Sequence, residues 1–215
     1  GIVIKDMKKR IGGFKYVYTK NGQEICMDMQ NPGDELMVLN PQNIAVIDKV
    51  KHFVAKYHLK YLHYRVLPRS LFGIESNFVE NNPEEVIPTS KMEKIKAENK
   101  IKLLTNDKAG KAGRAKWFLA DKTVISNNVE YIGQWQVVVS SANAGGQKRD
   151  HQLEIIDNHS AFGRARVGLA SFATKEEAYN FYLYVKTYIV KFMFLMTDES
   201  LTSLGKSVPD IIDYS

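Results

Sequence analysis

We predict an α+β fold, in which a few helices pack on a mixed or antiparallel sheet. Three features of the sequence support this prediction: a long amphipathic helix near the C-terminal end, a hairpin signal near the N-terminal end, and several short alternating segments between turns. Separate runs of strands and helices are typical of α+β proteins. The chain of 215 residues is long enough for one large domain or two small ones.

The clearest helix is predicted over residues 174–196. It begins with a capping box, because Thr174 and Glu177 can each satisfy a backbone N–H that a helix start leaves unpaired. Apolar residues then recur at steps of three and four, which places them on one face. These residues are Ala178, Phe181, Tyr182, Val185, Ile189, Phe192, Met193 and Met196. The face is wide and aromatic, so we expect it to be buried in a core.

The N-terminal part is predicted to contain a hairpin and a second helix. The hairpin joins residues 14–19 to residues 23–29 through an Asn-Gly pair, whose members both accept the positive φ of a tight turn. The second helix is expected to start at Asn40 or Asn43 and to end near His58.

The latter half is predicted to have the order β-β-β-α. Its strands are expected at residues 131–140, 151–157 and 164–172, ahead of the long helix, and an earlier strand is expected at residues 116–121. A glycine-rich basic loop, which ends in Lys148 and Arg149, is expected at residues 140–150 between the first two strands of the latter half. Trp135, Val137 and Val139 share one face of the first of these strands, because side chains alternate along a strand.

We expect residues 1–130 and residues 131–215 to be two parts of one compact unit, the first with the hairpin, the second helix and a basic loop. The chain begins with Gly1 in place of methionine, which favours a fragment of a larger protein. The one cysteine, Cys26, excludes an internal disulfide and fits the cytoplasm. No run is long and apolar enough to cross a bilayer, so we expect no membrane partner.

The formal net charge is +6, which favours a polyanionic partner such as nucleic acid. Residues 91–116 are the most basic stretch, and their middle part is rich in glycine and alanine, so we predict an exposed loop there. The loop is either a solvated run of charge or a surface that meets phosphates. Its candidate DNA contacts are Lys108, Lys111, Arg114 and Lys116.

The sequence contains no signature of a catalytic or metal site. The histidines and Cys26 do not stand at metal-ligand spacing, and neither a P-loop nor a Gly-x-Ser-x-Gly elbow is present. Glu98-Asn99-Lys100 has the residue types of a metal-dependent nuclease, but it lies in a lysine-rich segment without an apolar strand pattern. A metal-dependent nuclease domain and a basic protein-interaction domain are the alternatives to a DNA-recognition domain.

Three segments of the latter half carry a resemblance to a known family. They are SANAGG at residues 141–146, SFATKEEAYNFYLYVKTYIVKFMF at residues 171–194 and VPDIIDYS at residues 208–215, with a weaker echo in FGIESNF at residues 72–78. These segments resemble the C-terminal target recognition domain of adenine-specific DNA methyltransferases from type II and type IIG restriction-modification systems.

The resemblance implies a domain that binds double-stranded DNA and recognises its sequence. In that family an N-terminal domain binds S-adenosylmethionine and methylates adenine at N6. This chain lacks the Asn/Asp-Pro-Pro-aromatic loop that holds the target adenine, so we expect it to have no catalytic residue and no cofactor of its own. Its expected partners are double-stranded DNA and the N-terminal methyltransferase domain, with S-adenosylmethionine and Mg²⁺ assigned to the parent protein.

Candidate DNA contacts follow from the chemistry of the side chains. Arginine can bind guanine with two hydrogen bonds, asparagine and glutamine can do the same for adenine, and lysine and arginine bind phosphates. Arg164 and Arg166 stand two apart on a predicted strand and are therefore expected to face the same side. The candidates outside the basic stretch are Asn143, Gln147, Lys148, Arg149, Arg164, Arg166, Arg65 and Arg69. The alternative for each is an ordinary polar surface.

Overall fold

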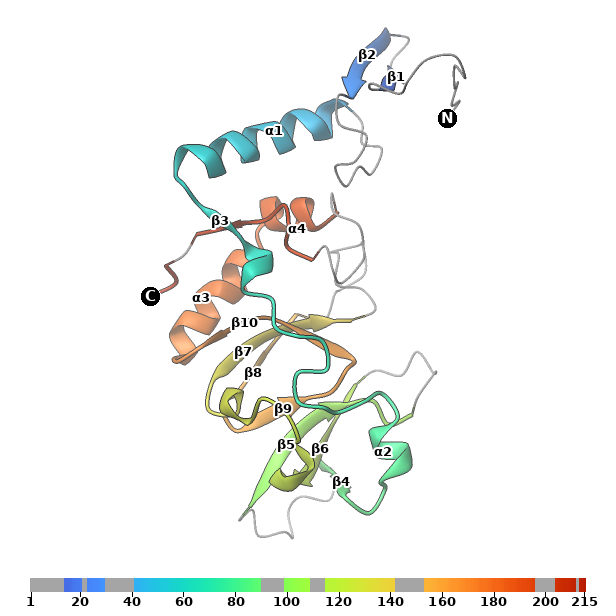
Figure 1. Ribbon diagram of the computed structural model, residues 1–215, viewed down its shortest axis with the longest axis vertical. Helices are drawn as coiled ribbons and strands as arrows, with labels where there is room; N and C mark the ends of the chain where they lie inside the picture. Colours follow the sequence, from blue (N-terminus) through green and yellow to red (C-terminus); the bar gives the residue numbers. More distant parts are fainter. Residues whose placement is uncertain are drawn as a thin grey trace. The chain divides into compact units, whose positions relative to one another are not determined.

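The computed structural model describes residues 14–20, 23–29, 41–89, 99–108, 115–141, 153–195, 204–211 and 213–215. Helices and antiparallel or mixed sheets occur together in these residues, so the protein has the α+β fold that the sequence predicts (Figure 1). Contacts divide the chain into two compact units, residues 1–57 and residues 58–215. This boundary differs from the division expected at residue 130, and one sheet of the second unit contains strands from both sides of residue 130.

The first unit contains a hairpin and a helix. Strands β1 (Phe14–Lys20) and β2 (Gln23–Met29) pair antiparallel along their full length, so the predicted hairpin is confirmed. Helix α1 (Pro41–Lys56) begins at a proline, which suits the first helical position because its missing N–H would have no partner there. The helix ends just before His58, whose φ of 51° is left-handed, in agreement with the predicted end.

The second unit contains two main sheets. One is a four-stranded mixed sheet of order β4-β6-β5-β9, in which β9 runs parallel to β5 and the other neighbours are antiparallel. The other is a three-stranded antiparallel sheet of order β10-β7-β8. The strands are β4 (Val86–Pro88), β5 (Lys100–Thr105), β6 (Lys116–Asp121), β7 (Trp135–Ser140), β8 (Glu154–Ile156), β9 (Ser160–Phe162) and β10 (Arg166–Phe172).

Short elements complete the second unit. Strand β3 (Lys60–Tyr61) pairs antiparallel with β11 (Pro209–Asp210), which fastens the C-terminal segment to the start of this unit. The others are η1 (Leu62–Tyr64), α2 (Phe78–Asn81), η3 (Lys122–Val124) and η4 (Val129–Tyr131). Of the helices in the described part of the chain, none has the length and apolar character needed to cross a membrane.

The predicted strands are present, but the order β-β-β-α is incomplete, because β9 lies between β8 and β10 and pairs in the other sheet. The predicted strand at residues 116–121 is β6, and β7, β8 and β10 lie within the three strands predicted for the latter half. Strand β5 corrects the expectation that the lysine-rich segment lacks a strand. Its residues Ile101, Leu103 and Leu104 are buried, whereas Lys102 between them is exposed. The alternation was present in the sequence, but the density of lysines concealed it.

The long helix predicted over residues 174–196 is two helices, α3 (Lys175–Val185) and α4 (Tyr188–Leu195). The predicted capping box is present: the Glu177 N–H donates to the Thr174 hydroxyl at 3.2 Å, and the Thr174 N–H donates to the Glu177 carboxylate at 3.0 Å. The break follows from tighter hydrogen bonds at the end of α3, where the Thr187 N–H and hydroxyl both donate to the Tyr184 carbonyl.

The break also moves the buried face. Along α3 the predicted residues Ala178, Phe181 and Val185 are buried. Along α4 the predicted Met193 is buried, but Val190 and Phe194 are buried with it in place of Ile189, which is 42% exposed. The predicted Met196 lies outside the described residues. A change of helix direction rotates the residues that follow, so the apolar stripe starts again in a new register.

The core of the second unit contains buried side chains from both sheets. The rings of Phe72 and Phe162 meet edge to face, with centroids 5.3 Å apart, among the buried side chains of the four-stranded sheet. Helix α3 packs on β7, β8 and β10. There Phe172, Phe181 and Tyr214 contact one another and join the sheet, the helix and the C-terminal segment.

Candidate nucleic-acid interface

The ends of β5 and β9 lie side by side. Strand β9 runs parallel to β5, with Leu104 opposite Phe162, and the Gly163 N–H then donates to the Leu104 carbonyl at 2.9 Å. Gly163 is required here, because a Cβ at this position would lie 2.3 Å from Thr105 Oγ1. The turn that follows β9 is therefore pressed against the last residue of β5.

The same turn lies against the end of β7. The Ser141 N–H donates to the Ala165 carbonyl at 2.9 Å, and Arg166 at the start of β10 is opposite Ser140. Strand β8 pairs with the middle of β7, and its first residue, Glu154, is opposite Val138 and accepts a hydrogen bond from Arg166. The described strands that lead into both predicted basic loops, β5–β6 and β7–β8, thus end around residues 163–166. We call this place the strand-end junction.

The structure corrects the expectation that Arg164 and Arg166 face the same side of one strand. Arg164 precedes β10 in the turn, and its Nη1 donates to Glu75 Oε2 at 2.6 Å. Arg166 is the first residue of β10, and its side chain is only 4% exposed. Its Nη2 donates at 2.9 Å to Glu154 of β8, on the far side of β7, so Arg166 links the two outer strands of the sheet. Only Arg164 of the two is accessible to a ligand.

The other described candidates lie in two places. Lys116 Nζ forms an ion pair of 2.5 Å with Asp107, and Lys108 next to it is exposed, so both lie at the β5–β6 end. Hydrogen bonding by Lys116 lowers the pKa of Asp107 and keeps its carboxylate charged. Arg65 instead binds Asp210 at 2.6 Å and lies over the Tyr214 ring, so it belongs to the C-terminal segment.

Arg69 lies in the loop between η1 and α2, next to the strand-end junction. In this loop Leu71, Phe72 and Ile74 are buried, whereas Arg69 and Glu75 are exposed. The predicted contacts that lie outside the described residues are Lys111, Arg114, Asn143, Gln147, Lys148 and Arg149. The structure therefore describes the strands that support the proposed interface, whereas the contacts predicted for these six loop residues stay predictions.

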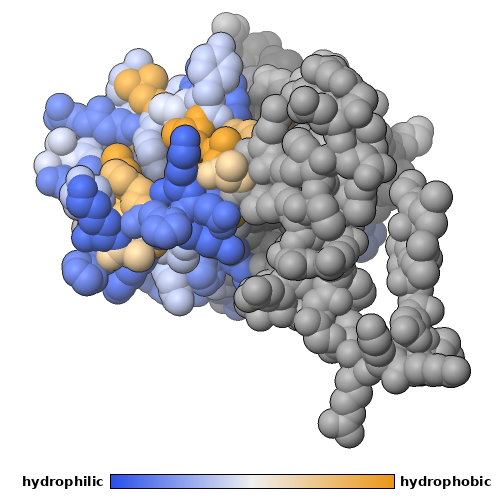
Figure 2. All heavy atoms as spheres, turned by 90° about the horizontal axis from the view of Figure 1, so that it is seen from above, coloured by the Kyte–Doolittle hydropathy of each residue, from blue (hydrophilic) through white to orange (hydrophobic). Residues whose placement is uncertain are grey.

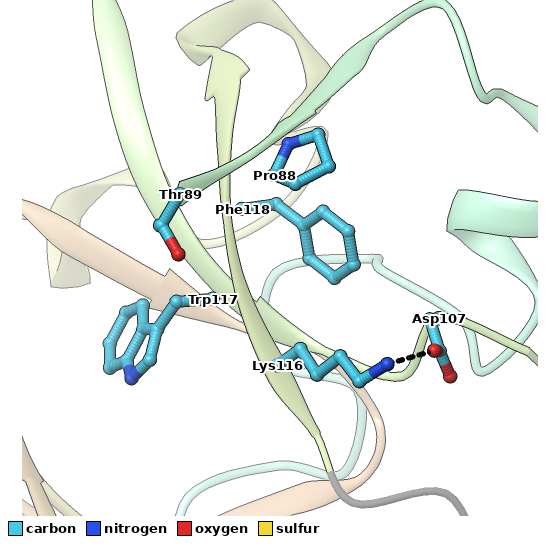
Figure 3. A pocket seen from close by; sticks show the side chains of 6 residues that line it. All are labelled: Pro88, Thr89, Asp107, Lys116, Trp117 and Phe118. Atoms are coloured by element: carbon cyan, nitrogen blue, oxygen red, sulfur yellow. Dashed lines mark hydrogen bonds and ion pairs between the residues drawn. The ribbon is translucent and has the colours of Figure 1, made fainter. Parts of the chain in front are cut away.

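A hollow of about 550 Å³ opens at the same end of β6. Strand β4 ends with Pro88 opposite Phe118, whereas β6 continues to Lys116 beside β5. The hollow is lined by Pro88, Thr89, Asp107, Lys116, Trp117 and Phe118. Figure 3 shows Lys116 and Phe118 on one side of β6 and Trp117 on the other, because side chains alternate along a strand. The hollow is thus lined from both sides of β6, beyond the point where β4 ends.

Sequence reasoning missed the carboxylates that organise this interface. Glu75 pairs with a basic residue 89 positions away, whereas the partners of Asp107 and Glu154 are nine and twelve positions away. No spacing rule identifies such partners before the strands are placed. Only the strand pattern of β5, which sets the position of Asp107, could have been found.

The described surface is largely polar, and several of its charges form ion pairs. Lys100 binds Asp121 at 3.6 Å and Lys102 binds Asp157 at 3.8 Å, in addition to the pairs above. Figure 2 shows mainly hydrophilic residues among the coloured atoms, with separate hydrophobic ones between them. Among the residues that the structure describes, no group of His, Cys, Asp and Glu side chains has the arrangement of a metal site. No protein family, curated protein or solved structure matches this chain.

Proposed function

We propose that this chain is a DNA target recognition domain that serves an N6-adenine DNA methyltransferase, or a fused methyltransferase-endonuclease, of a restriction-modification system. The family assignment rests on the sequence resemblance. The observation that carries DNA binding is the strand-end junction, because the strands that lead into both predicted basic loops end side by side there.

The junction suits DNA binding because one set of residues fixes the strands and another set remains exposed to contact DNA. Arg166 and Glu154 fasten the outer strands, and Gly163 fits tightly against Thr105, so the frame does not have to be ordered when a ligand binds. Exposed basic side chains such as Lys108 remain available for phosphates. The loop residues that we predict from the sequence, Lys148 and Arg149 among them, would add phosphate and base contacts.

The methyl transfer itself belongs to the parent protein in this proposal. An N-terminal domain there would bind S-adenosylmethionine and the target adenine, and this chain would hold the enzyme on its site. We expect the parent gene to encode an Asn/Asp-Pro-Pro-aromatic loop ahead of this chain. A parent sequence without that loop would contradict the methyltransferase assignment and leave DNA binding to be judged separately.

DNA binding is tested by fluorescence anisotropy with the full chain and a labelled duplex at several salt concentrations. An interface that neutralises four phosphates should lose about a hundredfold in affinity between 50 and 200 mM salt, at a slope of about 0.9 per phosphate. Negligible binding at 50 mM salt, or binding that does not respond to salt, would contradict the proposal.

Matched lysine variants locate the interface. Lys108→Ala removes a charge beside the junction, whereas Lys122→Ala removes an exposed charge next to Asp121, at the opposite end of the β5–β6 hairpin. We expect Lys108→Ala, and the double variant Lys148→Ala/Arg149→Ala, to weaken binding with little change in melting temperature, and Lys122→Ala to bind like the wild type. Equal losses for Lys108→Ala and Lys122→Ala would indicate a general charge effect.

A further inference from the structure

The loop that contains Arg69, beside the strand-end junction, is held by hydrogen bonds and by a buried side chain. The Gly73 N–H donates to the Ser70 carbonyl at 2.9 Å, and both residues have a positive φ. Asn128 Nδ2 donates to the Leu71 carbonyl at 2.6 Å. With Phe72 in the core, this loop has few ways to move.

This loop presents charged side chains next to the turn after β9. The Arg164 N–H donates to the Ile74 carbonyl at 2.9 Å, which places Arg164 against Glu75. The ion pair between Arg164 and Glu75 is 2.6 Å long, and its side chains are 39% and 48% exposed. Hydrogen bonding by Arg164 lowers the pKa of Glu75, so Glu75 stays ionised. Arg69 is exposed in the same loop and directly precedes the turn that the Gly73 N–H closes onto the Ser70 carbonyl.

We propose that Arg69 and Arg164 form a fixed phosphate-binding site on the DNA backbone, and that Glu75 is its positioning residue. This inference rests on the proposed function and assigns the two arginines to phosphates rather than to bases. Arginine suits the task because its planar guanidinium can bind Glu75 with one edge and a phosphate with another. The three side chains together carry one net positive charge, which a phosphate would neutralise.

The proposed role of Glu75 predicts that removing its charge will increase the affinity for DNA. Glu75 holds Arg164 through a hydrogen bond, but its negative charge also opposes an approaching phosphate. Glu75→Gln keeps an acceptor for Arg164 and removes that charge. DNA binding should therefore become tighter, by up to about eightfold at 0.1 M salt if one more counterion is released at a slope of about 0.9. A merely structural ion pair would give no gain in affinity.

The test uses anisotropy titrations of the full chain with a labelled duplex between 50 and 200 mM salt, together with melting temperatures. We expect Arg69→Ala and Arg164→Ala each to reduce affinity about eightfold at 0.1 M salt and to reduce the salt slope by about one. The control is Glu85→Gln, which removes an exposed carboxylate just before β4, at the end of the four-stranded sheet away from the junction. We expect no change in affinity for this control.

The remaining outcomes of these titrations would each contradict a different part of the proposal. Salt-dependent binding by the wild type that neither arginine variant reduces would overturn the phosphate site and leave the proposed function standing. Weaker binding by Glu75→Gln, or an equal gain for Glu85→Gln, would overturn the role of Glu75. If the wild type does not bind duplex DNA at any salt concentration, the proposed function fails and this inference fails with it.

Discussion

Replacing Gly163 with alanine tests the strand-end junction most directly. The backbone φ of Gly163 is not in the left-handed region, so alanine adds no backbone strain, and the whole effect comes from the new methyl group. That methyl would lie 2.3 Å from Thr105 Oγ1, 2.9 Å from Thr105 Cβ and 3.1 Å from Ile74 Cγ2. Two of these distances are too short for any real contact, so β5 or the turn after β9 must shift.

The expected cost follows from overpacking in a dense interior. Such insertions cost about 1–3 kcal/mol. For a unit of this size the melting temperature should fall by about 2–12 °C, at about 2–4 °C per kcal/mol. Thermal and urea unfolding followed by circular dichroism will measure both quantities. The matched control is Gly133→Ala, because a Cβ at Gly133 has no neighbour within 4 Å. This variant should be as stable as the wild type or up to about 1 kcal/mol more stable, because alanine restricts the unfolded chain.

A double-mutant cycle tests the contact between a Cβ at position 163 and Thr105 Oγ1. Thr105→Ala removes Oγ1 and should recover part of the loss in the Gly163→Ala background, since the Cβ contact at 2.9 Å remains. A Gly163→Ala variant with wild-type stability would refute the close approach of β5 and the turn. A loss that Thr105→Ala does not relieve would place its cause elsewhere.

Three further predictions concern the frame. Thr174→Ala should destabilise the protein by about 1 kcal/mol in urea unfolding, because it removes half of the capping box. Arg166→Met should cost about 1–3 kcal/mol, less than for a fully buried pair, because Glu154 remains partly solvated; no change would mean that this pair does not fasten the sheet. Tyr214→Phe removes the hydroxyl that donates to Asp210 at 2.9 Å and should cost about 1–3 kcal/mol at neutral pH. Burial raises the pKa of Tyr214, so its contribution is complete below the ordinary tyrosine pKa of about 10 and is lost as the pH rises above it. Unfolding measurements between about pH 9 and 11 should therefore show a larger loss for the wild type than for this variant.

The frame elements that depend on local chemistry could be predicted. The capping box at Thr174 and Glu177, the hairpin β1–β2 and the start of β6 each depend on residues close together in the chain. The break between α3 and α4 could not, because a single amphipathic stripe fits the residues on both sides. Strand β5 was missed for a different reason, since its lysines outweighed its alternating apolar residues.

The candidate site was predicted only as a set of residue types. The sequence named Arg164 and Arg166 together, but the structure exposes the first and buries the second. It also named Arg65 beside Arg69, although Arg65 pairs with Asp210 of the C-terminal segment. Whether a basic residue can contact DNA or instead links parts of the structure depends on its burial and on the carboxylate with which it pairs. The tertiary fold determines both.

The sequence by itself determined the α+β class, the capped helix start, the hairpin and the basic excess, because these follow from periodicity, turn chemistry and charge along the chain. Tertiary structure decided that β9 lies parallel to β5 and that β10 lies beside β7, which brings the turn at Gly163 to the ends of two hairpins. Such pairings join residues more than fifty positions apart for β5 and β9, and they depend on how buried faces fit together in three dimensions.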